Sequence, residues 1–355
     1  MWVTSQERKD AAKPATRNWL YMKHVSNILL IHQGAIGDFI LSLPAISSFK
    51  SSYPDASVEI RGYLHILQLV EKRFYADKIS SIDQKGMAQF YSEDSVLDAK
   101  LIERFKQFDL IIIFGRERSK TFLHNLKKIK VKEVCFINVF PQCDEDMDII
   151  DYQMSQLSRL GYGVLDKVSK LFPDEEDGKR ATEFFKKRRL NDNSLKVAIH
   201  IGSGSRMKVW PTGRFVQLSE KLIAMDGAKI ILPIGPADES MAQEYFDLID
   251  SEAIIPIANL PLNELAAILK KCDVYVGNDS GITHVAAAVG IPVVALFGPT
   301  DPLVWGMRGD NVSVMYKGGL ECSPCSREEM KRCVNRRCLE KISVEEVYGR
   351  VTNKL

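Results

Sequence analysis

The stretch IHQGAIGDFILSLPAI, residues 31–46, contains the junction that decides the fold class. Two glycines, Gly34 and Gly37, stand at its turn and let the backbone change direction sharply. An apolar run at 27–32 precedes the turn and predicts a buried strand. After the turn, apolar residues repeat with helical spacing at Phe39, Leu43 and Ile46. The stretch therefore predicts a strand followed by a helix over 38–51.

The same alternation of strands and helices continues to the end of the chain. Apolar runs predict further strands at 57–62, 109–115, 131–137, 196–201, 228–233, 273–277 and 292–297. Helical spacing in the second half predicts helices at 212–225, 238–249, 262–271 and 281–289. The run 109–115 has no polar alternation, as expected for a central parallel strand covered on both faces. The fold class predicted is α/β, with two doubly wound parallel-sheet domains and ligands at the carboxyl ends of the strands.

A charged segment at 170–194 separates the two series and predicts a domain boundary near its start. It contains one amphipathic helix and ends in a cluster of turn-forming residues. We expect a basic N-terminal extension at 1–24, an N-terminal domain at 25–172 and a C-terminal domain at 173–355.

Composition excludes several classes of protein. The chain has 355 residues, 45% of them hydrophobic, and a net charge of only +2, which is no footprint of a nucleic-acid-binding protein. No signal peptide and no run long enough to cross a bilayer is evident, so we expect a soluble, cytoplasmic protein. The tail 1–23 mixes basic residues with Trp2, Trp19 and Tyr21. It predicts either a solvated tail or a peripheral contact with the inner face of the cytoplasmic membrane.

Asp38 is the first candidate catalytic residue, because it stands at the first turn of a helix where phosphate-binding loops carry glycine, serine or lysine. The simpler interpretation is a helix cap, since carboxylates are favoured beside the free N–H groups and the helix dipole. The same field would hold Asp38 ionised, as a general base requires, at some cost in basicity. The glycine spacing is not that of a dinucleotide-binding fold.

The second candidate is the loop in HIGSGSRMKVWPTGRF, residues 200–215. Small residues around Ser203 expose backbone N–H groups, and Lys208 adds a mobile positive charge. This combination suits a phosphate or diphosphate, although it is not a Walker A sequence. An ordinary solvated loop is the alternative.

The third candidate is VGNDSGITHVAAAVGIPVVALFGPTDP, residues 276–302. Ser280 and Gly281 open a helix whose free N–H groups would bind an anion, and Asp279 beside them would accept hydroxyl groups. His284 lies one turn along the same face, as a ligand-binding residue or a packed core histidine. A separate helix start carries two further carboxylates, which predict either a ribose contact or a cap: Asp238 and Glu239.

Together these junctions resemble glycosyltransferase family 9, the ADP-heptose:lipopolysaccharide heptosyltransferases. The resemblance extends from about Asn27 to the C-terminus. The matching motifs are Gly34-x-x-Gly37-Asp38 with Leu43-Pro44-Ala45, the Gly-Ser loop with Lys208-x-Trp210-Pro211, and Asn278-Asp-Ser-Gly-x-x-His284 with Phe297-Gly-Pro-Thr-Asp-Pro302. Each motif is weak alone, but their order and separation are specific. The basic extension departs from the pattern, and Ser280 stands where threonine is also common.

The resemblance implies a GT-B fold, two Rossmann-like domains facing across a cleft. It implies an enzyme that transfers heptose from ADP-heptose to a hydroxyl of the lipopolysaccharide inner core, with inversion and with no metal or cofactor for catalysis. Asp38 would be the base. The donor-binding residues implied are Ser203, Lys208, Asp279, Ser280, Gly281, His284 and one of Asp238 and Glu239.

Other functions are compatible with the same motifs. The nearest is heptose transfer to a protein hydroxyl of an autotransporter-like acceptor. Another is a nucleotide-sugar-binding module without catalysis, against which the joint presence of Asp38, Lys208 and Asp279 argues. A nucleotide-sugar epimerase would need acid and base residues on both sides of the sugar.

Four of the seven cysteines gather near the C-terminus, at Cys322, Cys325, Cys333 and Cys338. In a reducing cytosol this density predicts a structural zinc or iron site first and reduced, unligated thiols second, with disulfides as the remaining alternative. Similar clusters occur in relatives of the family, including protein-modifying heptosyltransferases with iron bound to cysteines. Ser343-Val-Glu-Glu346 predicts the start of a C-terminal helix.

Overall fold

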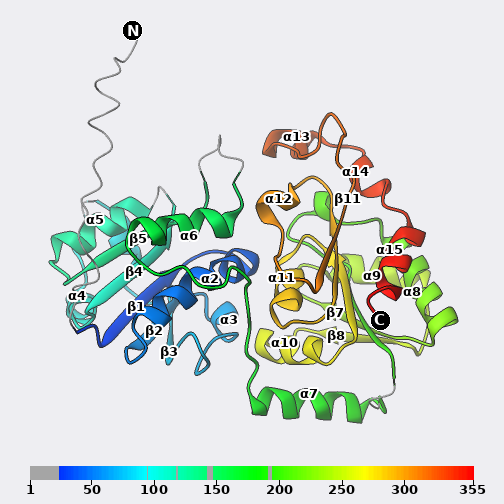
Figure 1. Cartoon of the computed structure of the whole chain (residues 1–355), viewed down its shortest axis with the longest axis horizontal. Helices are drawn as coiled ribbons and strands as arrows, with labels where there is room; N and C mark the ends of the chain where they lie inside the picture. The colour runs from blue at the N-terminus through cyan, green and yellow to red at the C-terminus, as the bar shows by residue number, and fades with distance from the viewer. Residues whose placement is uncertain (1–23, 94, 117–118, 142–146, 191–193) are drawn as a thin grey trace, which may run out of the picture.

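The structure is a computed structural model that describes residues 24–93, 95–116, 119–141, 147–190 and 194–355. It consists of two α/β units that lie side by side (Figure 1). The N-terminal tail at 1–23, for which the sequence predicted a solvated tail or a membrane contact, lies outside the described residues. Among the residues described, no helix combines the length and the apolar character needed to span a membrane.

The N-terminal unit is built on a five-stranded parallel sheet in the order β3-β2-β1-β4-β5. Its strands are β1 (Asn27–His32), β2 (Ser57–Gly62), β3 (Lys78–Ser81), β4 (Leu110–Gly115) and β5 (Val134–Asn138). Every residue of β4 is buried, as its uninterrupted apolar run predicted. The chain order reverses between β1 and β4, where a doubly wound sheet places its ligand site.

Helices cover both faces of this sheet and enclose two apolar cores. One core lies under α2 (Ile36–Ser52) and α6 (Ile149–Arg159) and continues into the C-terminal unit. The other lies under the 3₁₀ helix η2 (Met87–Tyr91), α4 (Ala99–Lys106) and α5 (Lys120–Lys128). A short helix, α3 (Leu64–Leu67), follows β2 at the edge that faces the second unit.

The C-terminal unit has a six-stranded parallel sheet in the order β11-β10-β9-β6-β7-β8. Its strands are β6 (Lys196–His200), β7 (Lys229–Ile234), β8 (Ile254–Ala258), β9 (Val274–Asn278), β10 (Val293–Phe297) and β11 (Val312–Tyr316). The chain reverses between β6 and β9, so the Gly-Ser loop and the Asn278–Gly281 turn leave neighbouring strands. The α/β fold with two doubly wound parallel sheets is confirmed.

The helices of this unit match the predicted positions within a few residues. They are α8 (Thr212–Asp226), α9 (Glu239–Leu248), α10 (Leu262–Lys270), α11 (Gly281–Ala288) and α15 (Val344–Thr352), with shorter η4 (Arg206–Lys208), α12 (Pro302–Trp305), α13 (Arg327–Arg332) and α14 (Arg337–Glu340). Ser343 caps α15 in a capping box with Glu346, as predicted. Trp210, fully buried, donates its indole N–H to the carbonyl of Ile342 and thereby ties the C-terminal segment to the Lys-x-Trp-Pro loop.

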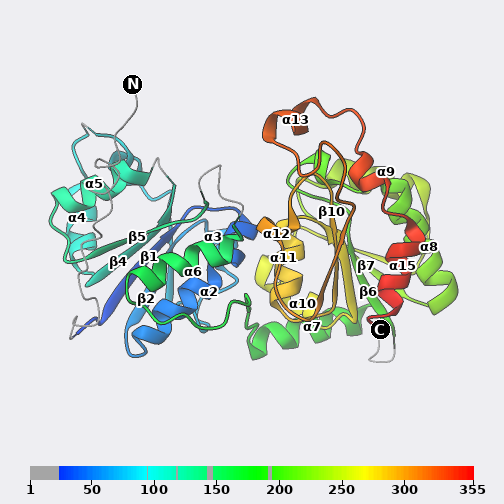
Figure 2. The same ribbon diagram turned by 45° about the horizontal axis from the view of Figure 1, so that its top comes forward.

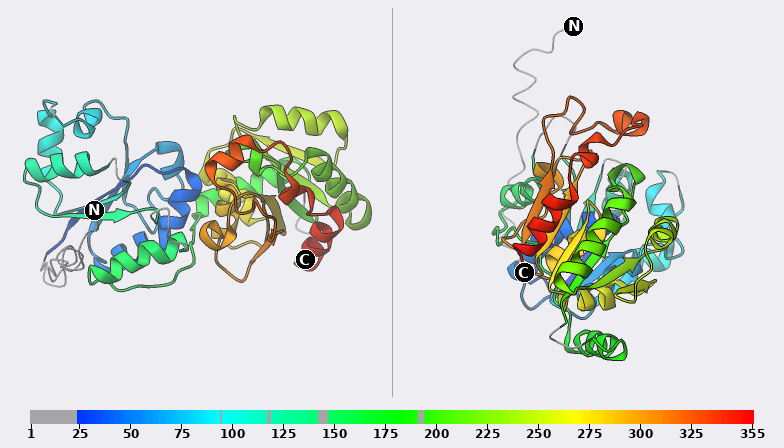
Figure 3. Two further views of the ribbon diagram at one scale, coloured as in Figure 1. Left: turned by 90° about the horizontal axis from the view of Figure 1, so that it is seen from above. Right: turned by 90° about the vertical axis from the view of Figure 1, so that its right-hand side faces the viewer.

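A linker leads from α6 to α7 (Glu175–Lys187), which packs on α10 at the margin of the C-terminal unit (Figure 2). The boundary predicted at residues 172 and 173 falls in this linker and stays a prediction. Seen from above, the two units again lie side by side (Figure 3, left), and α2 contacts α11 of the C-terminal unit.

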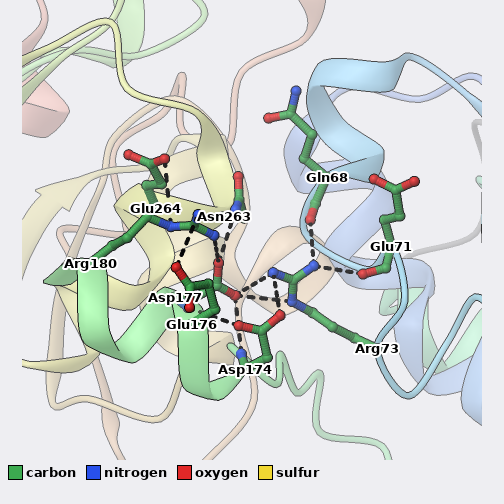
Figure 4. A network of polar contacts seen from close by, with 9 residues as sticks. All are labelled: Gln68, Glu71, Arg73, Asp174, Glu176, Asp177, Arg180, Asn263 and Glu264. Atoms are coloured by element: carbon green, nitrogen blue, oxygen red, sulfur yellow. Dashed lines mark hydrogen bonds and ion pairs between the residues drawn. The ribbon is translucent and has the colours of Figure 1, made fainter.

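Ion pairs join the two units beside the linker (Figure 4). Arg73 of the N-terminal unit donates from Nε to Oδ2 of Asp177 on α7 at 3.1 Å and pairs with Asp174 at 3.2 Å. Asp177 is fully buried and also accepts from Asn263 of α10 at 3.0 Å. Arg180 also donates to Asp177, at 3.3 Å, so this buried carboxylate holds side chains of both units together.

Candidate active site

A cavity of about 910 Å³ lies where the two sheets present the carboxyl ends of their strands. The N-terminal unit lines it with Ala35–Gly37 and with residues around α3. The C-terminal unit supplies an apolar wall, with Ile234, Ile257 and Leu262 among its members, and a polar wall of His200, Ser203, Asp238, Ser280, Gly281. The cavity therefore offers one apolar and one polar side to a ligand held between the units.

The turn before α2 is closely packed around Asp38. Asp38 is the third residue of the helix, and its Oδ2 accepts the backbone N–H of Ala35 at 3.2 Å, so it does act as a cap. A Cβ on Gly34 would lie 2.6 Å from Asp38 Cβ and 2.6 Å from the ring of His32, which leaves room for glycine alone. His32 accepts the N–H of Gly34 at Nδ1 (3.1 Å) and contacts Ser42 at Nε2 (3.2 Å). Burial lowers the pKa of His32 to about 3, so the ring that supports this turn is neutral.

Burial raises the pKa of Asp38 above its ordinary value. The N–H of Ala35 and the positive charges of Arg116 and Lys208 oppose this effect, and the negative charge of Asp279 adds to it. From the sequence we expected the helix field to hold Asp38 ionised at some cost in basicity; in the structure, desolvation outweighs the field. A carboxylate with a raised pKa is a stronger base, which is the property that proton abstraction requires.

The N-terminus of α11 lies against the N-terminus of α2. A Cβ on Gly281 would lie 2.7 Å from Cβ of Ile36, and one on Gly37 would lie 3.2 Å from the ring of His284. The Ser280 side chain caps α11 by accepting from Thr283 N. The two glycines thus allow the backbones of the two units to approach closely.

His284 is buried between these helices, and its Nδ1 has no hydrogen-bond partner among the residues that the structure describes. Its Nε2 lies 4.0 Å from Oδ1 of Asp279. Desolvation lowers the pKa of His284 to about 4 despite the nearby carboxylate, so the ring is neutral near pH 7. His284 occupies the space between Asp279 and the Asp38 turn.

Lys208 and Asp279 form an ion pair at the same place. Lys208 Nζ donates to Asp279 Oδ2 at 2.7 Å, and the hydroxyl of Thr300 donates to the same oxygen at 2.7 Å. Ser203 donates its hydroxyl hydrogen to the backbone carbonyl of Asp279 at 2.7 Å. Lys208 keeps about a quarter of its side chain exposed while Asp279 is buried, so the lysine is the partner that remains accessible to a ligand.

The two carboxylates at the start of α9 differ in position. Asp238 is buried, lines the cavity and contacts His200 Nε2 through Oδ2 at 3.1 Å. Glu239 is exposed and begins the helix itself. His200, which was not among the predicted site residues, ends β6 directly before the Gly-Ser loop and is buried in the polar wall.

Comparisons with known proteins agree with this geometry. The sequence model of "Glycosyltransferase family 9 (heptosyltransferase)" matches residues 154–334, about half of the chain. The chain belongs to glycosyltransferase family 9. A curated relative, Lipopolysaccharide heptosyltransferase 3 of Escherichia coli (strain K12), is 26% identical over 340 residues, which cover 90% of this chain and 95% of the relative.

Solved structures show the same fold as this family 9 chain. A family 9 glycosyl transferase from Veillonella parvula superposes with a TM-score of 0.76 at 22% identity, covering 93% of this chain and 97% of that one. The E. coli ADP-heptose LPS heptosyltransferase II superposes with a TM-score of 0.70 at 16% identity, covering 92% and 98%. The predicted family and its two-domain GT-B fold are confirmed.

Two groups of predicted site residues come together in this family 9 chain. One group lies where α2 faces α11. It contains Asp38 of the N-terminal unit together with Lys208, Asp279 and His284 of the C-terminal unit. Ser203, Asp238, Ser280 and Gly281 line the cavity. Glu239 is not among the lining residues of this cavity. The roles of all these residues stay predictions.

The four clustered cysteines are free thiols near one another. Burial, and then the negative charges of the other three thiolates, raise the pKa of Cys325 to about 11. Among the described residues, no group of three or more His, Cys, Asp or Glu side chains is arranged to hold a metal ion, so the thiols as placed do not fit one. A structural metal at these cysteines stays an untested prediction.

Proposed function

We propose that this chain transfers heptose from ADP-heptose to a hydroxyl group of the lipopolysaccharide inner core. The donor would occupy the C-terminal unit and the acceptor the N-terminal unit. The names of the curated relative and of the E. coli structure support the donor and the acceptor class. The observation that carries the proposal is the cavity between the units, which the N-terminus of α11 lines at Ser280 and Gly281. The partly buried carboxylate of Asp38 lies directly after the lining residues Ala35–Gly37, and the charge of Lys208, which pairs with Asp279, acts on it.

The donor fits the two walls of the cavity. The apolar wall at Ile234, Ile257 and Leu262 would hold the nucleobase. Asp238 lines the cavity and Glu239 does not, which supports Asp238 as the carboxylate that would accept a ribose hydroxyl. The diphosphate would lie at the N–H groups of Gly281 and Ile282. Lys208 has three ammonium hydrogens and donates one to Asp279, so two remain for hydrogen bonds to the diphosphate oxygens.

The transfer would proceed in one displacement that inverts the anomeric carbon. Asp38 removes the proton of the acceptor hydroxyl. At the same time the oxygen of that hydroxyl forms a bond to the anomeric carbon. The bond between that carbon and the diphosphate oxygen breaks, and ADP leaves with the electron pair. Lys208 and the N-terminus of α11 stabilise the developing charge on the leaving group, since such fixed electrostatic effects are usually the largest contribution to catalysis. These groups provide positive potential without a catalytic metal.

The substitution Asp38→Asn tests the proposed base. The amide keeps the size of the side chain but cannot take up the proton, so we expect turnover to fall by about a thousandfold. ADP affinity, measured by calorimetry, should stay within about twofold, because the diphosphate binds on the other unit. Asp55→Asn, at an exposed carboxylate, is the matched control and should leave both values unchanged. Wild-type turnover in the Asp38 variant would refute the assignment.

The acceptor is tested by supplying two acceptors in parallel with ADP-heptose. We expect transfer to a lipopolysaccharide core acceptor, detected by a mass increase of one heptose. Transfer to an autotransporter-like protein instead would refute the lipopolysaccharide assignment and keep the glycosyltransferase one.

A further inference from the structure

Three loops of the C-terminal unit are joined by a chain of buried polar side chains. Asp238, from the loop after β7, contacts Nε2 of His200 at 3.1 Å. The other ring nitrogen of His200, Nδ1, lies 3.3 Å from the hydroxyl of Ser280, at the start of α11. His200 is 3% exposed, Asp238 6% and Ser280 8%, so each bond is shielded from water.

The partners of His200 determine which ring nitrogen carries the hydrogen. The Asp238 carboxylate only accepts, and Oδ2 also receives the backbone N–H of Gly235 at 2.9 Å. Nε2 of His200 must therefore carry a hydrogen to bond to it. In the neutral ring Nδ1 is then an acceptor, and the hydroxyl of Ser280 is the group placed to donate to it.

Within the described part of the chain, the side-chain partners of the Ser280 hydroxyl lie inside the protein: His200, Thr283 and Tyr275. Thr283 Oγ1 lies 3.1 Å from this hydroxyl and donates its own hydrogen to the carbonyl of Asn278. Thr283 N donates to the Ser280 oxygen. While the Ser280 hydroxyl donates to one of these partners, its hydrogen points into the protein and away from a ligand in the cavity.

We propose that His200 is a positioning residue of the donor site and acts through Ser280, with Asp238 fixing its tautomer. This rests on the proposed function, because it concerns the site that would hold the diphosphate. His200 holds the hydroxyl of Ser280 inward, and the backbone N–H groups that open α11 are thereby held toward the cavity. The diphosphate then binds backbone groups and Lys208 rather than the serine hydroxyl.

The packing around Asp238 shows that the loops carrying Asp238, His200 and Ser280 fit closely together. A Cβ on Gly202 would lie 1.8 Å from Oδ1 of Asp238, so the loop after β6 has glycine where the carboxylate approaches. The side-chain amide of Asn278 donates to the carbonyl of Gly202 at 3.1 Å, which links the same loop to the turn that carries Ser280. The three loops therefore hold one another in one arrangement.

Two substitutions of His200 separate its two contacts. The amide nitrogen of glutamine reaches the position of Nε2, so His200→Gln keeps the contact with Asp238 and loses the one with Ser280. The shorter His200→Asn places an amide oxygen near Nδ1 and keeps the contact with Ser280. We expect about tenfold weaker ADP binding for His200→Gln and a smaller loss for His200→Asn. The donor KM should rise while kcat changes less, because Asp38 is untouched.

A double-mutant cycle with Ser280→Ala tests whether His200 acts through the serine. We expect His200→Gln to have almost no further effect on ADP affinity in the Ser280→Ala background. Full additivity of the two losses, or an unchanged affinity in His200→Gln, would overturn the positioning role. Thermal unfolding of each variant without ligand verifies that the fold is intact.

The unmodified protein gives an independent readout. The ¹⁵N chemical shifts of His200 should show a protonated Nε2 and an unprotonated Nδ1, and the opposite tautomer would overturn the inference. Failure of the proposed function has a different signature. If Lys208→Gln and Ser280→Ala both leave ADP affinity unchanged, the donor site is misplaced; if Lys208→Gln weakens binding and His200→Gln does not, only the positioning role fails.

Discussion

Two helices meet at the centre of this molecule by their N-termini, and they use the same electrostatic feature differently. The N-terminus of α2 is occupied by its own carboxylate, Asp38, which accepts the N–H of Ala35. The N-terminus of α11 is capped by the neutral hydroxyl of Ser280. The first helix end already carries an anion, and the second keeps its positive potential for an anion from outside.

The comparison explains why the two ends lie together. Gly37 and Gly281 bring the helices close, so Asp38 lies near the place where a diphosphate would bind without lying in it. A base and a leaving group must stand on opposite sides of the carbon that is attacked. Two helix N-termini from different units satisfy that requirement, because α2 carries the Asp38 carboxylate and α11 carries only a neutral cap.

Making α11 resemble α2 should have the largest effect on donor binding. Ser280→Asp keeps a good N-cap but places a negative charge at the free helix end. Because like charges brought together cost several kcal/mol, we expect ADP affinity to fall by about a hundredfold or more in calorimetry. Ser280→Thr, which keeps a neutral cap, is the control and should bind ADP nearly normally. Equal ADP affinity in the two variants would show that no anion binds at α11.

Removing the lysine beside the free helix end should have the next largest effect. Lys208→Gln loses a charged hydrogen bond to the diphosphate, so we expect the donor KM to rise by about tenfold to a hundredfold. Lys208→Arg keeps the charge and should recover most of the loss. An unchanged KM in Lys208→Gln would separate Lys208 from donor binding.

The ionisation of Asp38, at the N-terminus of α2, should determine the pH dependence of turnover. Asp38 accepts a proton only when it is ionised, so kcat should fall as pH drops through its raised pKa, about tenfold for each unit below it. The midpoint should lie above about 3.9, the ordinary value for aspartate. The same shift means that folding favours the protonated carboxyl, so ionisation of Asp38 costs stability as pH rises. Asp38→Asn should therefore be at least as stable as the wild type at pH 7, and a clearly lower melting temperature would contradict the burial argument.

The histidine between the two helix ends should make the smallest difference, which appears in stability. The folded protein keeps His284 neutral down to a pKa of about 4, whereas the unfolded chain protonates it near 6.5. Stability is therefore complete above pH 6.5 and is lost as pH falls toward 4, by roughly 1–3 kcal/mol for this residue. His284→Gln should unfold in urea with a weaker pH dependence over that window. The same pH dependence in variant and wild type would show that His284 is not the group responsible.

The central strands were predictable, because their apolar runs are long and uninterrupted. Strands β1 and β2 have the predicted bounds, and β4 and β10 differ by one residue at one end. The strands missing from the prediction lie toward the sheet edges: β3 and β11 end their sheets, and β8 contains an exposed proline. Short strands with polar or exposed residues have no continuous apolar run to detect.

The site residues were predictable from motifs, but their contacts were not. Asp38 was named from a turn, and nothing within that turn indicates that Lys208 and Asp279 of the other unit lie near it. His200 was missed because its partners, Asp238 and Ser280, are 38 and 80 residues away in the chain. Only the return of three strands to one sheet edge brings them together.

A crystal structure of the protein with ADP would show directly whether the diphosphate binds at α11. We expect the diphosphate at the N-terminus of α11, within hydrogen-bond distance of the backbone N–H of Gly281 and of Lys208 Nζ, with no contact to Asp38. A diphosphate bound at the N-terminus of α2, or away from both helices, would contradict this expectation.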